Sequence, residues 1–243
     1  MRSNTSSRFG LRKTILAVSV CLLASASPGS GQDVRMVKCR FASLETGVAM
    51  PAMLALSADG SGFPIAVPTG SLSEETACFS KTNHFSFLQA GDHQPAAIAS
   101  IPENVKSAML VFIPAPKTPN TLPWRVFVVE DTPENFPDGG AFVANFHSQD
   151  IRFVIGESKI MLRPGSFSGV ASPTKRDDFN MAQVAFQFQQ DGNWRNASET
   201  MLRFLPNKGY LMFAYFDAAS GRPRITTFQN VRVPVTVPEV AAP

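Results

Sequence analysis

Hydrophobic and polar residues alternate along much of the chain with the two-residue period of β-strands. The clearest case is residues 182–190 (AQVAFQFQQ), where apolar side chains fall on one face and glutamines on the other: Val184, Phe186 and Phe188 against Gln183, Gln187 and Gln189. Residues 140–147 alternate in a similar way. The pattern predicts antiparallel strands.

Short turn sequences separate several of these strands. Asp191, Gly192 and Asn193 stand between residues 182–190 and a second extended stretch at 194–199. Residues 156–158 (GES) likewise separate 151–155 from 159–162. Glycine and asparagine tolerate the positive φ angles that tight hairpin turns require, so both places predict hairpins.

Three further stretches are apolar on both faces: residues 108–113, 124–129 and 210–216. Their shortness and their Phe, Val and Tyr content favour central strands over buried helices. The 16 glycines and 19 prolines interrupt the chain too often for a long helix. One helical turn is expected at residues 132–136 (TPENF), where Thr132 could cap it.

These elements predict an all-β protein, an antiparallel β-sandwich of immunoglobulin-like or jelly-roll-like type, in two packed β units. Residues 33–113 would form the first unit and residues 124–233 the second, joined by the proline-rich stretch 114–123 (PAPKTPNTLP). A single sandwich with a long crossover at this stretch fits equally well. Residues 234–243 form a proline-rich tail, and no internal repeat is convincing.

Residues 1–26 have the parts of a secretory signal. Four basic residues and no acid flank the apolar stretch 14–24, and Ala24, Ser25 and Ala26 supply the small residues that signal peptidase accepts. As a helix this stretch reaches only about 16 Å, short of the roughly 30 Å apolar core of a bilayer. We therefore expect export to the periplasm or the medium, with no transmembrane segment in the mature chain.

Cleavage would change the charge balance. The full chain has 22 Lys and Arg against 19 Asp and Glu, and loss of the four basic residues of the signal leaves it nearly neutral. Nucleic-acid binding and binding to anionic lipid both depend on dense positive charge. We therefore expect neither nucleic acid nor an anionic lipid surface as a partner.

Cys39 and Cys78 would remain in the mature chain. An oxidising compartment favours a disulfide between them, and two buried free thiols are the alternative. The sequence cannot decide, because a bridge needs a Cα–Cα distance below about 7 Å.

No motif predicts a catalytic site, a metal site or a cofactor. His84, Asp92 and His93 lack the close spacing of zinc ligands. Residues 165–169 (GSFSG) carry phenylalanine where a nucleophile elbow needs serine, so they predict a turn and a strand. The acidic loop 130–140 lacks the spaced pattern of a calcium loop.

Trp194 is the best candidate for contact with a ligand, with Asn193 beside it. The chain has two tryptophans, and Trp194 follows directly after a predicted turn, where an aromatic ring can be exposed. Trp124, the other, begins a predicted central strand.

Several stretches together resemble a family of uncharacterised, secreted, β-rich bacterial proteins. They are residues 110–114 (LVFIP), 124–140 leading into 141–146, 155–156, 162–165 (LRPG), 191–194 (DGNW) and 203–216. The resemblance covers most of the mature chain and less distinctly its N-terminal third. It implies an exported β fold and brings no activity, cofactor or functional residue.

Three functions remain open. The first is a non-enzymatic exported protein that binds a protein or a polymer through its surface, as β-sandwiches commonly do. The second is a carbohydrate-active hydrolase whose carboxylates only the fold brings together. The third is a carbohydrate-binding module. An exposed Trp194 near a groove with Asn and Gln would favour it, and a buried Trp194 would count against it.

Overall fold

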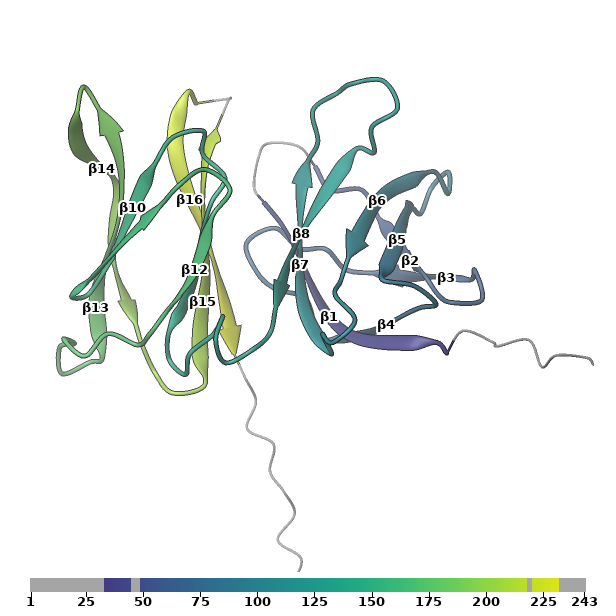
Figure 1. Ribbon diagram of the computed structural model, residues 1–243, viewed down its shortest axis with the longest axis horizontal. Coiled ribbons are helices and arrows are strands. Elements are labelled where there is room, and N and C mark those ends of the chain that lie inside the picture. The colour runs from purple at the N-terminus through teal and green to yellow at the C-terminus, as the bar shows by residue number, and fades with distance from the viewer. Residues whose placement is uncertain (1–32, 45–48, 218–219, 232–243) are drawn as a thin grey trace, which may run out of the picture. The chain divides into compact units, whose positions relative to one another are not determined.

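The computed structural model describes residues 33–44, 49–217 and 220–231. These residues form sixteen β-strands and no helix (Figure 1). The all-β prediction is therefore confirmed. The proposed signal, residues 1–26, and the proline-rich tail, residues 234–243, lie outside the described residues.

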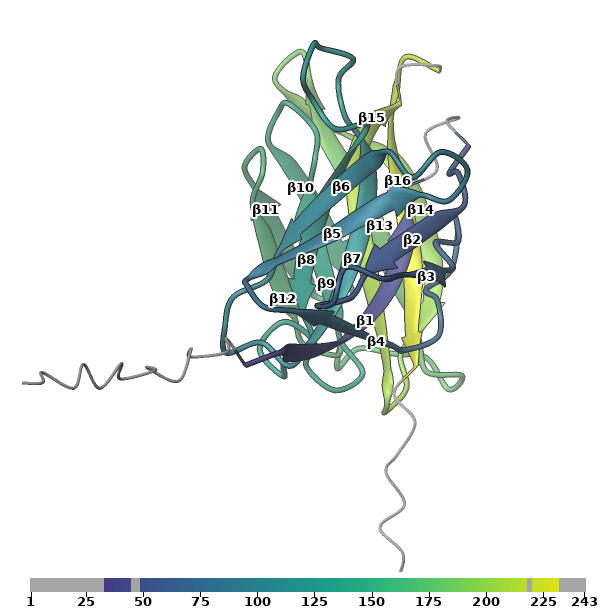
Figure 2. The ribbon, with the colours of Figure 1, turned by 90° about the vertical axis from the view of Figure 1, so that its right-hand side faces the viewer.

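The first eight strands form one sandwich, which we call the first half. One sheet has the order β4-β1-β7-β8 and the other the order β3-β2-β5-β6. Figure 2 looks onto the second of these sheets. The strands are β1 (Arg35–Ser43), β2 (Met53–Leu56), β3 (Gly62–Ile65), β4 (Thr76–Ser80), β5 (His84–Gln89), β6 (Pro95–Ser100), β7 (Ser107–Pro114) and β8 (Trp124–Glu130).

The remaining eight strands form a second sandwich, the second half. Its sheets have the orders β12-β9-β15-β16 and β11-β10-β13-β14. The strands are β9 (Ala141–Asn145), β10 (Ile151–Ile155), β11 (Ser158–Leu162), β12 (Phe167–Val170), β13 (Met181–Gln190), β14 (Asn193–Arg203), β15 (Lys208–Asp217) and β16 (Arg222–Val231).

The two halves have the same topology, pairing for pairing. β1 pairs with β4 antiparallel and with β7 parallel, and β9 pairs in the same way with β12 and β15. The β2-β3, β2-β5, β5-β6 and β7-β8 pairs likewise correspond to β10-β11, β10-β13, β13-β14 and β15-β16. The register shift within β5, between Phe87 and Leu88, recurs within β13 between Phe186 and Gln187. The fold is therefore an internal duplication.

Each half has its own apolar core between its two sheets. In the first half the core is rich in phenylalanine, and the rings of Phe41, Phe87 and Phe112 meet with centroids 5.2–6.4 Å apart. In the second half Phe153 and Phe186 pack across paired strands at 5.7 Å. The alternation of the sequence produces these cores, because every second residue of a strand faces the opposite sheet.

A third core lies between the inner sheets of the two halves. It contains Val111 of β7, Val129 of β8, Phe142 of β9 and Phe213 of β15, all buried. The inner strands are thus packed on both faces, so that the four sheets follow one another as layers (Figure 1). This explains why residues 108–113, 124–129 and 210–216 are apolar at nearly every position.

The proline-rich stretch has a different place from the one the sequence suggested. β7 and β8 pair antiparallel in one sheet, so residues 115–123 are the loop between two neighbouring strands of the first half. The passage between the halves falls instead at residues 131–140. There the N–H of Phe136 donates to the Thr132 carbonyl at 2.8 Å and closes a single turn. The N–H of Asn135 donates to the Thr132 hydroxyl at 3.4 Å, so Thr132 caps this turn as expected.

Candidate binding sites

A chain of hydrogen-bonded side chains runs across the solvent face of the β11-β10-β13-β14 sheet. Arg152 Nε donates to Gln187 Oε1 at 2.6 Å, and Gln187 Nε2 donates to Asn196 Oδ1 at 2.7 Å. Asn196 Nδ2 and Gln183 Nε2 then donate to the two carboxylate oxygens of Glu199, at 2.7 and 2.5 Å. With Trp194, these residues form what we call the amide face.

The strand register brings the members of the amide face together. Arg152 of β10 lies opposite Gln187 of β13, and Gln187 lies opposite Asn196 of β14. The register shift beside Gln187 places Glu199 opposite Ala185, within reach of both Asn196 and Gln183. Side chains from three strands thus form one polar surface.

Trp194 lies at one end of the amide face. The guanidinium carbon of Arg152 lies 4.6 Å from the centroid of the half-buried Trp194 ring, in a cation–π contact. Arg152 therefore holds both the ring and the first amide of the chain. The turn before Trp194 has positive φ at Asp191 (51°) and at Gly192 (74°), the combination of a type I′ hairpin.

Asn193, which the sequence grouped with Trp194, is occupied elsewhere. Its Nδ2 donates to the Asp191 carbonyl at 3.2 Å within the turn. The structure thus places Trp194 in a polar cluster and leaves Asn193 outside it.

The corresponding face of the first half has different chemistry. The solvent face of the β3-β2-β5-β6 sheet carries Leu54, Ser86 and Ile98, and Ile98 is 48% exposed. Its one side-chain hydrogen bond between the described strands joins His84 Nδ1 and Ser100 Oγ at 3.0 Å. The duplicated halves have therefore diverged on their solvent faces, and only the second carries an aromatic and amide cluster.

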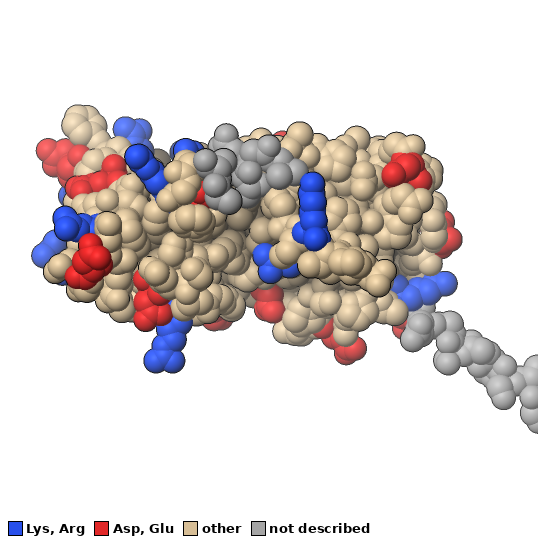
Figure 3. Space-filling model, turned by 90° about the horizontal axis from the view of Figure 1, so that it is seen from above, with Lys and Arg blue, Asp and Glu red and all other residues tan. Residues whose placement is uncertain are grey.

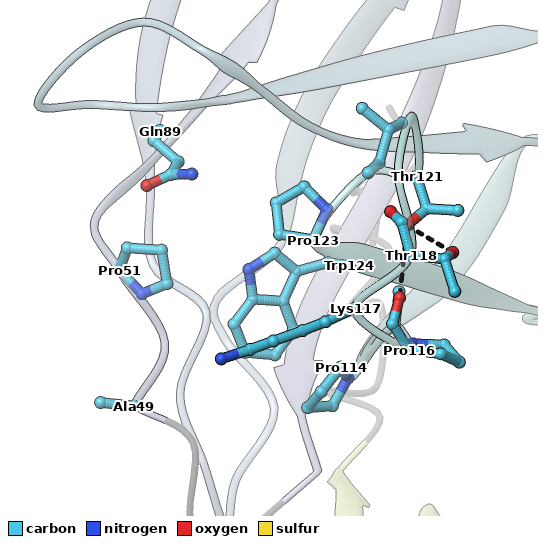
Figure 4. A pocket seen from close by; sticks show the side chains of 12 residues that line it. Ala49, Pro51, Gln89, Pro114, Pro116, Lys117, Thr118, Thr121, Pro123 and Trp124 are labelled. Carbon is cyan, nitrogen blue, oxygen red and sulfur yellow. Dashed lines mark hydrogen bonds between the residues drawn. The ribbon is translucent and has the colours of Figure 1, made fainter.

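A pocket of about 620 Å³ opens beside the proline-rich loop of the first half (Figure 4). Trp124, which is 5% exposed, lies at its base. The walls are mainly apolar and come from the loop and from the β1–β2 connection: Ala49, Pro51, Pro114, Ala115, Pro116, Leu122 and Pro123. The polar lining residues are Gln89, Lys117, Thr118 and Thr121.

The loop that forms one wall is fixed by its own hydrogen bonds. The Thr121 hydroxyl donates to the carbonyls of Thr118 at 2.7 Å and Pro116 at 3.2 Å. The N–H of Ala115 closes the loop by donating to the Pro123 carbonyl at 2.9 Å. Because proline also fixes φ, this wall is largely preformed.

The second half has a pocket at the corresponding place. It measures about 430 Å³ and lies between the β13–β14 and β15–β16 hairpins. Gln190, the last residue of β13, lines it as Gln89, the last residue of β5, lines the first pocket. Arg222, the first residue of β16, lines it as Trp124, the first residue of β8, lines the first pocket.

Cys39 and Cys78 are buried, free thiols in the structure. They lie diagonally across the β1-β4 pair, because Cys39 is opposite Thr76 and Cys78 is opposite Val37. The Cα atoms of such diagonal neighbours are about 7–8 Å apart, beyond the roughly 7 Å within which a disulfide forms without backbone movement. A hydrogen bond between the two thiols and burial raise the pKa of Cys39, which disfavours its reactive thiolate form.

The histidines and acids singled out in the sequence do not form a metal site. His84 begins β5 and His93 lies in the turn after it, at opposite ends of the strand. Across the described ranges, no group of three His, Cys, Asp or Glu side chains could hold a metal ion. The acidic loop is structural, since Asp138 Oδ1 accepts from the Asn207 N–H at 2.8 Å and so ties two loops together.

Residues 165–169 form a turn and the start of β12, as the sequence predicts. No helix follows them, so a nucleophile elbow is not formed.

Acidic and basic residues are interspersed on the surface. Figure 3 shows one face on which single Lys, Arg, Asp and Glu side chains are scattered among uncharged ones. Among the described residues, no helix has the length and apolar character needed to cross a membrane.

Comparison with known proteins does not assign the chain to a family. No protein-family model matches it, and no curated protein matches it either.

Sequence reasoning identified Trp194 and missed most of the amide face. The signal was present in part, since Gln183 and Gln187 share the polar side of one strand. Arg152, Asn196 and Glu199 lie on other strands and join the glutamines only through the register.

Proposed function

We propose that the protein is an exported, non-enzymatic binding protein and that its amide face binds a neutral polysaccharide. The observation that carries the proposal is the hydrogen-bonded chain from Arg152 to Glu199 with Trp194 at its end. Sugar rings present two chemistries: hydroxyl groups around the edge and C–H groups on the faces. The amide face offers a partner for each.

Amide side chains suit hydroxyl groups because each is both a donor and an acceptor. The amides of Gln187 and Asn196 each use one donor and one acceptor within the chain, so each keeps a second N–H and further lone pairs. Their partners hold them in place, which lowers the entropy lost when a ligand binds. Trp194 adds an apolar ring beside them.

A neutral ligand fits the charge of this surface. Arg152 and Glu199 have opposite charges, and each is hydrogen-bonded to amides of the chain. Lys159 on β11 and Arg203 on β14 are further exposed cations of this face. This arrangement gives no strong attraction to a polyanion.

A protein partner that adds a strand to the edge strand β14 is less favoured. β14 is the edge of its sheet and carries Arg195, Glu199 and Arg203, while its partner β13 has a register shift. Charged residues and irregular register are features with which proteins protect exposed edges against strand addition. The face of the sheet is therefore the better surface for recognition.

Export remains part of the proposal and rests on residues 1–26 of the sequence. A disulfide between Cys39 and Cys78 is proposed with it, since the two residues are diagonal neighbours on the paired strands β1 and β4. Its formation would need a small shift between β1 and β4. Expression with residues 1–26 intact, followed by cell fractionation and mass determination, tests both points.

The binding proposal is tested by retention on polysaccharides. The purified mature protein is run through native gels, each of which contains one soluble neutral polysaccharide: a glucan, a xylan or a mannan. We expect retardation by at least one of them, and its loss in Trp194→Ala and Gln187→Val. Ile98→Ala, on the corresponding edge strand of the first half, is the matched control and should be retarded normally.

Two results would count against the proposal. Retardation that survives both amide-face substitutions would place binding elsewhere. Release of new reducing ends from the retained polymer would show hydrolysis and refute the non-enzymatic part.

A further inference from the structure

The pocket at Trp124 combines an apolar body with a single charge. Its base is the Trp124 ring, and Pro51, Leu122 and Pro123 contribute to its walls. A volume of about 620 Å³ lies within the roughly 300–1,000 Å³ of small-molecule sites. Its size and lining suit an apolar group of several carbon atoms.

Lys117 supplies the charge. Figure 4 shows its side chain pointing from the loop toward the Pro51 side of the pocket. Of the described residues that line the pocket, Lys117 alone is charged, and no acid lies among them. The ion pairs of the described residues are Lys38–Glu75 and Asp217–Arg224, so Lys117 has no carboxylate partner among them.

We propose that this pocket is a binding site for a medium-chain aliphatic carboxylate. The hydrocarbon chain would lie on Trp124 between the proline walls, and the carboxylate would pair with Lys117 at the mouth. Each CH₂ group removed from water contributes about 0.8 kcal/mol, so the chain supplies most of the affinity. Lys117 supplies the preference for an anion. The site is independent of the amide face.

The second half has a pocket beside the equivalent hairpins. One cation, Arg222, is among its described lining residues, beside Gln190 and Pro223. Arg222 begins β16 and therefore corresponds to Trp124 and not to Lys117. This pocket is smaller and includes the amide of Asn196 in its wall. The combination of a lysine and a tryptophan is therefore a feature of the first-half pocket, which is the larger and more apolar of the two.

The experiment is a titration of the full mature protein with octanoate and decanoate, followed by calorimetry and by the Trp124 indole NMR resonance. Decanoate should bind about tenfold more tightly than octanoate, since its two additional CH₂ groups are buried. Lys117→Gln should weaken decanoate binding about fivefold, the size of an exposed ion pair, and should leave decanol unaffected. Lys106→Gln, which removes an exposed lysine outside the pocket, is the control.

Three outcomes would overturn the proposal. The first is an unchanged Trp124 resonance at saturating decanoate. The second is equal affinity for decanoate and decanol, which would show unspecific adsorption to apolar surface. The third is an equal effect of the Lys117 and Lys106 substitutions. None of these results bears on polysaccharide binding by the amide face, so the two proposals fail separately.

Discussion

Replacement of Phe213 by alanine tests whether the two halves share a core. Phe213 of β15 is fully buried, and its ring lies 5.4–6.4 Å from the rings of Phe127, Phe142, Phe146 and Phe228. Phe127 belongs to the first half and the other three to the second. Truncation would remove most of a ring from a packed cluster, which typically costs about 3–5 kcal/mol of the free energy of unfolding.

The assay is thermal and urea unfolding of the mature protein, followed by fluorescence and by circular dichroism. For a chain of this size a loss of 1 kcal/mol lowers Tm by about 2–4 °C, so a decrease of about 10 °C is expected. Because the third core joins the halves, unfolding should remain a single transition by both probes. Phe216→Ala, on the same strand but 51% exposed, is the control and should cost below about 1 kcal/mol.

The reasoning would be refuted by a Phe213→Ala protein as stable as the Phe216→Ala protein. It would also be refuted by two separate transitions of which only one moves, because the halves would then unfold independently.

Three other predictions concern backbone packing, pH and the thiols. A Cβ atom at Gly169 would lie 2.2 Å from a backbone carbonyl oxygen, so Gly169→Ala should lower the free energy of unfolding by about 3 kcal/mol in urea melts; Gly91→Ala, with open space around it, should cost nothing. The carboxylate of Glu157 accepts hydrogen bonds from the 174–175 loop, which lower its pKa from 4.5 to about 2. Because the pKa of Glu157 is lower in the folded protein, its carboxylate stabilises the fold above pH 4.5, and this stabilisation is lost as the pH falls toward 2. Between pH 4.5 and 2, Tm should therefore fall less steeply in Glu157→Gln than in the parent protein. Parallel Tm curves for the two proteins would contradict this. If Cys39 and Cys78 become bridged after export, the mature protein should be about 2 Da lighter than the reduced chain and take up no thiol reagent in denaturant; two reactive thiols in freshly exported protein would exclude the bridge.

Alternation and turn chemistry predicted most of the strands of the second half. β13, β14 and the type I′ turn between them follow directly from the polar and apolar pattern around Asp191 and Gly192. Of the stretches that are apolar on both faces, residues 108–113 and 210–216 form the central strands β7 and β15, as predicted. Residues 124–129 form β8, which is an edge strand of its sheet, so the prediction of a central strand was wrong there. The third core explains why these stretches are apolar.

The duplication could not be predicted from the sequence. Corresponding strands can differ in length, in burial pattern and in side chains, as β6 (PAAIAS) and β14 (NWRNASETMLR) illustrate. Topology depends on which strands pair, and alternation carries no information about pairing partners. For the same reason residues 114–123 resembled a boundary between units, although they form a loop inside one sheet.

The candidate sites depend on the same missing information. Trp194 was visible because it follows a turn, whereas Arg152 and Asn196 became its neighbours only through the register of β10, β13 and β14. The Trp124 pocket is assembled from residues far apart in sequence, such as Pro51 and Lys117. Only the three-dimensional structure shows that the charged side chain of Lys117 lies beside an apolar pocket.

The central claim is that the amide face binds a neutral polysaccharide. The chain has two tryptophans, so a ¹H–¹⁵N spectrum of the mature protein contains one indole resonance for each, assigned with Trp194→Phe. The decisive measurement is this spectrum during titration with hexasaccharides of the polymer that retards the protein. The account predicts that the Trp194 resonance moves to saturation while that of Trp124 stays in place, and that Gln187→Val abolishes the shift. A Trp194 resonance that stays unmoved while the sugar binds would contradict it.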